Sequence, residues 1–471
     1  MTSLRHRRLV LTGSITGAVI VALDGTVLTV AQPTLQRTLH ATFAQVQWTS
    51  TGYLIAVASL LVFAGRLGDR YGHQRLFALG ILGFGAASAG IGLAPNVGWV
   101  IALRIVQGIF GALLQPATLG MLRAAYPPDR LGMPLALRTS AIGLAAAAGP
   151  LLGGALVAQL GWRAVFFLNV PPALLIGSLA LAVRVPPPLP TPPGRALTGL
   201  DLPGAGLLGI TLVCLVHTLV ALPAHGWTTT TTAAVLTAAV AFAAFVHHER
   251  RTGSPLVPPR VAASKAVASS LAILLAASAA LFGTLFVCSY YLQNVRHLDP
   301  FQCGLQVLPL PMLMVLSAPA SAVLQRRYGP RRTTTAAMAL LTLGTLLLSR
   351  LDETSTPLEA GTGFLLLGAG FGTVMVTATA VIVRHAPVDN AGVAGGLQQT
   401  AMNIGPTLGV ATATMLLTYT PTLRSTLLPL AALAALGTLC AATLPAASSA
   451  RGGNSQPDPA TYPQEGASET I

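Results

Sequence analysis

The sequence predicts an all-α integral membrane protein with fourteen membrane-spanning helices. Hydrophobic residues make up 53% of its 471 residues and charged residues only 8%, whereas a soluble protein carries about a quarter charged residues. Long apolar runs recur along the whole chain, and we take each as a span of a bilayer core about 30 Å thick. The fourteen runs are residues 9–31, 46–64, 76–94, 98–122, 134–159, 163–183, 203–222, 231–247, 265–293, 303–325, 334–349, 358–383, 393–418 and 424–445.

Basic residues set the orientation of these spans. The net charge is +14, but nearly all arginines lie in short loops between apolar runs, where they determine topology and do not indicate nucleic-acid binding. If the loops alternate between the two sides, 21 of the 27 basic residues lie on the side of the N-terminus and five on the other. We therefore expect both termini in the cytoplasm and the protein in the plasma membrane. The first run contains Asp24, so we read it as a retained span, not a signal peptide.

Two short motifs occur twice at nearly the same offset. Arg70-Tyr71-Gly72 recurs as Arg327-Tyr328-Gly329, and Gly149-Pro150 recurs as Gly405-Pro406. The repeats predict two related six-helix halves, as in alternating-access transporters. We expect a first bundle at 1–184, a Pro-rich linker with two inserted helices at 185–263, a second bundle at 264–445 and a disordered tail at 446–471.

The most deeply placed acid lies in the first predicted span. Asp24 is about 14 residues into that run, or roughly 21 Å from its cytoplasmic end. A carboxylate inside a bilayer is costly unless it is paired, hydrated or protonated, so it is a functional candidate by default. We expect Asp24 to bind and release protons. A purely structural pairing with Arg104 is the alternative.

Arg104 in the fourth run is the only arginine deep in a predicted span. Arg104, Gln107 and Gly108 share one helix face because they are spaced i, i+3 and i+4. A fixed cation near a carboxylate lets each conformation set the proton affinity of that carboxylate, so we expect Arg104 to tune Asp24. We place Gln107 in the substrate cavity. The alternative is an Arg104 side chain that reaches the membrane surface.

The segment between the second and third runs is dense in charge. Residues 65–75 read Gly-Arg-Leu-Gly-Asp-Arg-Tyr-Gly-His-Gln-Arg. We expect a tight loop at the membrane surface, in which glycines allow close backbone approach and Asp69 caps the helix that follows. The repeat copy has Arg326 in place of Asp69, and this asymmetry indicates that Asp69 contacts the other half. An ordinary positive-inside loop is the alternative.

The fifth run carries a stripe of small residues. Ala141, Ala145, Gly149 and Gly153 recur every four residues, a spacing that lets helices approach closely. Pro150 removes one helical hydrogen bond and favours a bend.

These segments resemble motifs of the major facilitator superfamily. Residues 65–75 resemble its signature between spans two and three, residues 23–33 resemble the first-span motif of its fourteen-span drug:proton antiporters, and residues 143–154 resemble its exporter motif. The chain departs from these motifs at Thr29, His73, Gln74 and Ala145. The resemblance covers most of residues 10–420. It implies the major facilitator fold and proton-coupled efflux of small amphipathic compounds such as drugs or antibiotics.

The resemblance also implies residue roles. It assigns proton coupling to Asp24 and Arg104, the inner gate to Gly65, Asp69, Arg70, Gly72 and Arg75, and a seal against leakage to Gly143, Gly149, Pro150, Gly153 and Gly154. In the ninth run, Tyr291, Gln293 and Asn294 either line the substrate cavity or form an aromatic belt at the outer interface.

Other classes of function find little support in the sequence. No segment resembles a nucleotide-binding loop, a metal site or a catalytic triad, and the four cysteines are scattered. We therefore expect a monomeric non-enzyme without cofactor or metal, which draws its energy from the proton gradient. The alternatives are an importer or uniporter of a specific metabolite and a non-transporting membrane sensor.

Overall fold

The computed structural model describes residues 4–182, 201–298, 300–352, 354–419 and 422–444. These residues are helical with no strand, as the composition predicts. The α-helices are α1 (Leu4–Thr38), α2 (Phe43–Tyr71), α3 (His73–Gly92), α4 (Val97–Ala125), α5 (Gly132–Leu160), α6 (Trp162–Phe167), α7 (Val170–Ala182), α8 (Leu202–His225), α9 (Thr229–Arg251), α10 (Pro259–Ala262), α11 (Lys265–Asn294), α12 (Pro300–Val307), α13 (Pro309–Leu348), α14 (Pro357–His385), α15 (Ala391–Tyr419) and α16 (Leu423–Ala441). The Pro-rich stretch 186–193 and the tail 446–471 lie outside the described residues.

Twelve helical segments of this part of the chain are long and apolar enough to cross a membrane, compared with the fourteen spans expected. One of them, Gln302–Leu348, has 47 residues, about twice the length that a bilayer core requires. Gly329 interrupts it with a φ of 82°. The 29-residue helix α15, which contains Gln398, Gln399 and Asn403, is not among the twelve.

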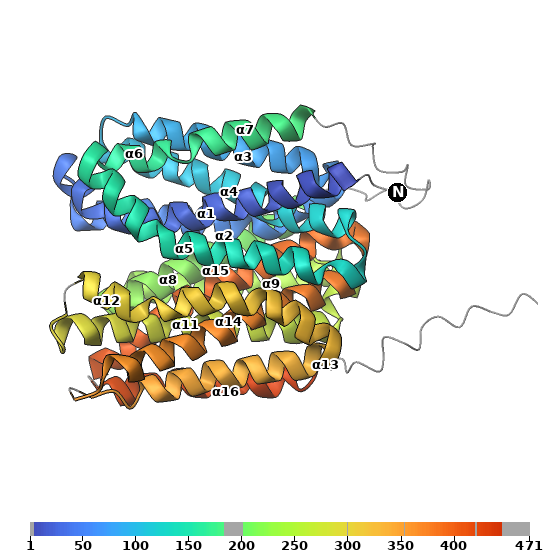
Figure 1. Cartoon of the computed structure of the whole chain (residues 1–471). Helices are drawn as coiled ribbons and strands as arrows, with labels where there is room; N and C mark the ends of the chain where they lie inside the picture. The colour runs from blue at the N-terminus through green and yellow to red at the C-terminus, as the bar shows by residue number, and fades with distance from the viewer. Residues whose placement is uncertain (1–3, 183–200, 299, 353, 420–421, 445–471) are drawn as a thin grey trace, which may run out of the picture.

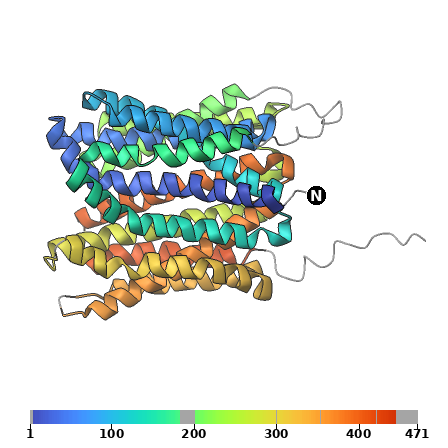
Figure 2. The same ribbon diagram turned by 45° about the horizontal axis from the view of Figure 1, so that its top comes forward.

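The long helices run roughly side by side (Figures 1 and 2). Two apolar clusters are formed almost entirely by α1 to α7, and a third joins residues of α10 to α16. The helices α8 and α9 pack on each other, and α8 packs against α2 and α15. The apolar residues Val62, Phe245, Leu256 and Val393 form a cluster between these helices.

The two copies of the repeated Arg-Tyr-Gly motif have the same local geometry. Gly72 and Gly329 both have positive φ, 96° and 82°, a region that glycine enters without strain. The Arg70 guanidinium lies 5.4 Å from the centre of the Tyr71 ring, and that of Arg327 lies 5.3 Å from the Tyr328 ring. Both copies therefore reverse the chain in the same way.

The turn in the 65–75 segment is tighter than the loop over 65–75 that we expected. Helix α2 continues to Tyr71, a single residue, Gly72, makes the turn, and α3 begins at His73. One residue with positive φ is enough to reverse the chain. The expectation that Asp69 caps α3 is wrong, since no side chain caps that helix. The Asp69 carboxylate instead binds backbone N–H groups of α15.

Candidate functional site

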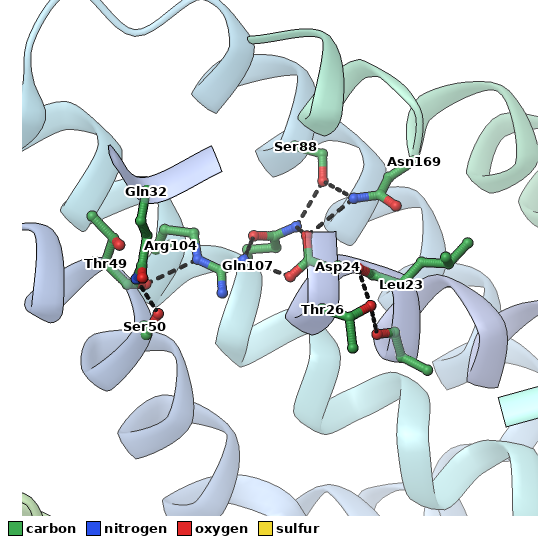
Figure 3. A network of polar contacts seen from close by, with 11 residues as sticks. Leu23, Asp24, Thr26, Gln32, Thr49, Ser50, Ser88, Arg104, Gln107 and Asn169 are labelled. Atoms are coloured by element: carbon green, nitrogen blue, oxygen red, sulfur yellow. Dashed lines mark hydrogen bonds and ion pairs between the residues drawn. The ribbon is translucent and has the colours of Figure 1, made fainter. Parts of the chain in front are cut away.

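Asp24 of α1 and Arg104 of α4 form a buried ion pair. The Nη1 atom of Arg104 lies 2.6 Å from Oδ2 of Asp24, and the two residues are 4% and 1% exposed. Figure 3 shows the pair at the centre of a polar network. Removing one partner of a buried ion pair leaves an uncompensated charge and costs about 3–5 kcal/mol.

Two side-chain amides complete the surroundings of the Asp24 carboxylate. Gln107 Nε2 and Asn169 Nδ2 each donate to Asp24 Oδ1 at 3.0 Å. Gln107 Nε2 also donates to Ser88 Oγ at 2.7 Å. The carboxylate thus receives hydrogen bonds from three donor side chains, Arg104 and Gln107 of α4 and Asn169 between α6 and α7, which hold it in place (Figure 3).

Arg104 has further partners besides the carboxylate. Its Nε atom donates to the Thr49 carbonyl oxygen at 3.0 Å, and its Nη1 atom donates to Gln107 Oε1 at 2.6 Å. The guanidinium also lies over the Tyr53 ring, 4.3 Å from its centre, close enough for a cation–π interaction. These contacts keep the cation in a fixed position beside the Asp24 carboxylate.

Sequence reasoning identified the ion pair but missed several of its partners. Ser88, Asn169, Thr49 and Tyr53 were given no role, although all lie in or beside apolar runs. A polar side chain inside an apolar run is costly unless it is satisfied. This signal marks Ser88 and Asn169, but it does not say which helix holds their partner.

A second polar site joins α2 to α15. It is formed by residues 65–73 and 390–393, which we call the closed end. The Asp69 carboxylate accepts hydrogen bonds from the backbone N–H of Gly392 at 2.7 Å and of Val393 at 3.1 Å. His73 Nε2 lies 3.2 Å from the same carboxylate. Arg66 Nη1 donates to Asn390 Oδ1 at 3.4 Å. Segments more than 300 residues apart are thereby tied together.

The backbone itself makes a close contact at the closed end. A Cβ atom added at Gly65 would collide with the Gly392 carbonyl, and one added at Gly392 would collide with Gly65. Arg70 and Arg75, which we expected in the gate, are exposed. Arg66, which we did not assign to the gate, is the arginine that donates a hydrogen bond across the closed end, to Asn390.

Other contacts join α4 and α5 to helices α10 to α16, which we call the later helices. Ser140 Oγ of α5 donates to the Val315 carbonyl of α13 at 2.7 Å, and a Cβ atom at Gly143 would lie 3.2 Å from Val315. Gln399 Nε2 of α15 donates to Gln115 Oε1 of α4, and both side chains are buried.

The remaining small residues of α5 have different neighbours. A Cβ atom at Gly149 would collide with Thr26, and one at Gly153 would lie 2.8 Å from Val27, so both glycines pack against α1. A Cβ atom at Gly154 would meet nothing within 4 Å. Pro150 lies inside α5 without ending it. Among the glycines of the predicted exporter motif, only Gly143 is positioned so that an added Cβ atom would meet a residue of α13.

Tyr291, Gln293 and Asn294, near the end of α11, have contacts within α11 and with other residues of the α10–α16 cluster. Gln293 and Asn294 are exposed. Gln293 Nε2 approaches Cys303 Sγ at 3.7 Å, and Asn294 Nδ2 donates to the Tyr290 carbonyl within its own helix. Tyr291 packs against the apolar cluster of the later helices. These contacts do not join the three residues to the Asp24 network.

Comparison with known proteins identifies the family. The sequence profile of the Major Facilitator Superfamily matches residues 15–410. The chain belongs to this superfamily. The non-enzymatic nature expected from the sequence agrees with membership of a transporter family, and the multi-pass membrane protein expected from the apolar runs agrees with it too.

Relatives within the major facilitator superfamily include resistance and export proteins. The chain is 40% identical to the tetracenomycin C resistance and export protein of Streptomyces glaucescens over 396 residues. This match covers 84% of this chain and 73% of that protein. It is 35% identical to the puromycin resistance protein of Streptomyces alboniger, over 83% of this chain and 78% of that protein.

A solved structure shows the same fold at low identity. The human transporter MFSD10 superposes with a TM-score of 0.66 and 17% identity, over 92% of this chain and 99% of that one. This likeness concerns the fold alone.

Proposed function

We propose that this protein exports small amphipathic compounds, such as drugs or antibiotics, across the plasma membrane in exchange for protons. The observation that carries the proposal is the buried ion pair of Asp24 and Arg104. The Asp24 carboxylate accepts hydrogen bonds from Arg104 and from two side-chain amides. Buried ionisable groups in a membrane protein mark ion and proton pathways. The names of the relatives, which include resistance and export proteins, support the direction of transport.

The proposed cycle uses the contacts already described. At the closed end, Asp69, Gly65 and the Gly392 backbone hold the cytoplasmic side shut. Release of these contacts would admit substrate from the cytoplasm. Movement of α1 against α4 would separate Asp24 from Arg104 and let Asp24 take up a proton, and re-formation of the pair would expel that proton. The proton gradient would supply the energy, without a cofactor.

The proposed architecture has fourteen spans, arranged as two six-helix bundles and two inserted helices. Dividing the 47-residue candidate at Gly329 and adding α15 raises the twelve candidates to fourteen. The matching geometry of the two Arg-Tyr-Gly turns supports a repeat, with α8 and α9 as the inserted pair. The distribution of basic residues supports cytoplasmic termini. One chain supplies both bundles, so we propose a monomer.

Proteoliposomes with an imposed pH gradient test this function. We expect the wild-type protein to move a fluorescent amphipathic dye only while the gradient persists, and a protonophore to abolish the movement. Asp24→Asn keeps the shape of the side chain and should abolish gradient-driven transport. Asp352→Asn makes the same chemical change at an exposed acid outside the candidate spans and should transport like the wild type. Unimpaired gradient-driven transport by Asp24→Asn would overturn the proton-coupling role.

A further inference from the structure

Arg138 of α5 is a buried arginine without a partner. It is 3% exposed, and its buried Nε atom has no hydrogen-bond partner. Among the residues that the structure describes, Arg138 forms no ion pair or side-chain hydrogen bond. Burying an unpaired charge is expensive, and proteins retain such a charge chiefly where it serves a function.

The residues of α5 around Arg138 pack against three other helices. Leu131, Leu135, Arg138 and Ile142 follow one another at spacings of three or four residues and so share one helix face. Leu131 and Leu135 belong to an apolar cluster that also contains Leu119 and Leu122 of α4 and Ala380 and Val383 of α14. Further along the face, Ile142 packs against the apolar cluster of the later helices. Arg138 therefore lies among residues of α5 that pack against α4, α13 and α14.

Other buried polar side chains lie between the same groups of helices. Gln399 of α15 bonds Gln115 of α4. Gln398 Nε2 donates to Thr379 Oγ1 of α14 at 3.3 Å, while its Oε1 atom is buried without a partner. These side chains lie at or beside contacts between α4 or α5 and the later helices. Separation of those helices would expose a polar surface that this conformation hides.

The start of α5 adds positive charge on the same side of the molecule. Arg130, Arg326 and Arg384 line a surface pocket together with Gly132 and Ala322. Gly132 is the first residue of α5, six residues before Arg138, or about 9 Å along the helix. Clustered charge of one sign raises the local concentration of oppositely charged ligands. The acid within the polar network, Asp24, is already bound to Arg104.

We propose that Arg138 binds an anionic group of the exported compound when the closed end opens, and that the substrates therefore include amphipathic weak acids bearing a carboxylate, enolate or phenolate. This inference rests on the proposed export function and adds a substrate class to it. The arginine-lined pocket attracts the anion, Arg138 pairs with it, and the buried glutamines of α4 and α15 bind its other polar groups. The substrate supplies the counter-ion that Arg138 lacks.

Two planar compounds that differ in charge test whether Arg138 recognises an anion or is needed for transport of any compound. The probes are 4,5-dihydroxyanthraquinone-2-carboxylate and its methyl ester, tested for binding to the purified protein and for transport in proteoliposomes with a pH gradient. We expect the wild-type protein to bind and move the acid better than the ester. Arg138→Gln should lower binding and transport of the acid about tenfold, as expected for loss of a charge-assisted hydrogen bond. Transport of the ester should change less than about twofold.

Three further measurements keep the inference falsifiable. Arg138→Lys should restore part of the preference for the acid, and Arg37→Gln, at an exposed arginine near the end of α1, should behave like the wild type. Arg138→Gln should melt at the same or a higher temperature, because a buried unpaired charge is removed. Equal loss of acid and ester, a lower melting temperature, or no preference of the wild type for the acid would overturn the role of Arg138. Preferential binding of the acid without gradient-driven transport would overturn the proposed function alone.

Discussion

The Asp69 carboxylate accepts a hydrogen bond from the backbone N–H of Gly392 at 2.7 Å, across 323 residues of sequence. Gly392 is the second residue of α15, and the next N–H, of Val393, donates to the other oxygen of the same carboxylate. The first N–H groups of a helix have no partner within it, and they carry partial positive charge. An acid of α2 thus caps a helix that lies far along the chain, and this cap links the two parts of the molecule at the closed end.

Asp69→Asn should weaken this closure. The amide keeps one acceptor oxygen but loses the charge, and the loss of a charge-assisted hydrogen bond should shift the opening equilibrium about tenfold. The measurement is labelling of Ala136→Cys, at a fully buried position between α5, α13 and α14, by a charged maleimide. Labelling should be faster in the Asp69→Asn background than with Asp69 intact. Equal rates in the two backgrounds would show that Asp69 does not hold the contact.

Gly65→Ala should block closure sterically, because its Cβ atom would collide with the Gly392 carbonyl. Gly206→Ala, within α8, is the matched control, since a Cβ atom there meets nothing within 4 Å. Alanine even favours a helix over glycine by about 1 kcal/mol. We expect dye transport in proteoliposomes to fall at least tenfold with Gly65→Ala and to persist with Gly206→Ala. Similar activities of the two variants would argue against a backbone contact in the transport cycle.

Asn169→Ala should impair both stability and transport. It removes a donor to Asp24 Oδ1 at 3.0 Å and leaves a cavity beside a buried carboxylate, a loss of about 1–3 kcal/mol. The melting temperature of the purified protein should fall, and gradient-driven dye transport should fall with it. Thr354→Ala, at an exposed loop position, serves as the control. A variant that melts and transports like the wild type would remove Asn169 from the proposed proton site.

Asp201, which caps α8, should make stability depend on pH. Burial by itself raises the pKa of Asp201, but hydrogen bonds from the Gly204 N–H, His248 and Glu249 outweigh burial and hold the pKa below its usual range. A carboxyl whose pKa is lowered by folding stabilises the protein above its unfolded pKa of about 3.9, and this contribution disappears as the pH falls through the folded value.

Asp201→Asn should therefore be less stable than the wild type at pH 7, and the difference should shrink as the pH is lowered below about 4. The measurement is the melting temperature in detergent across this range. A constant difference between the two proteins at all pH values would contradict the linkage of this carboxyl to folding.

The sequence predicts the helical class and the family well, and it predicts single residues unevenly. Apolar runs and intramembrane charges are local signals, so Asp24, Arg104 and the turn at Gly72 stand out from the chain. The partners of these residues are not local. Asn169 lies 145 residues from Asp24, and no periodicity connects the two.

The contacts of the closed end were harder still to predict from the sequence. Asp69 was expected to contact the other half, but its acceptance of two N–H groups of α15 depends on how α2 and α15 pack. Arg66 could not be separated from Arg70 and Arg75 by charge alone. Only the path of α2 through Tyr71 decides which arginine points toward Asn390. Gln115 and Gln399 likewise meet because of tertiary packing.

The close contact between Gly65 and Gly392 has a consequence for how such a protein can diversify. The contact is made by main-chain atoms, so it depends on the absence of side chains and not on the chemistry of any one of them. Under the export function proposed above, substitutions in α4, α5 and α14 would change which molecules are recognised, while the backbone contact between Gly65 and Gly392 would still form and break. The range of exported compounds would then change without any change in this contact.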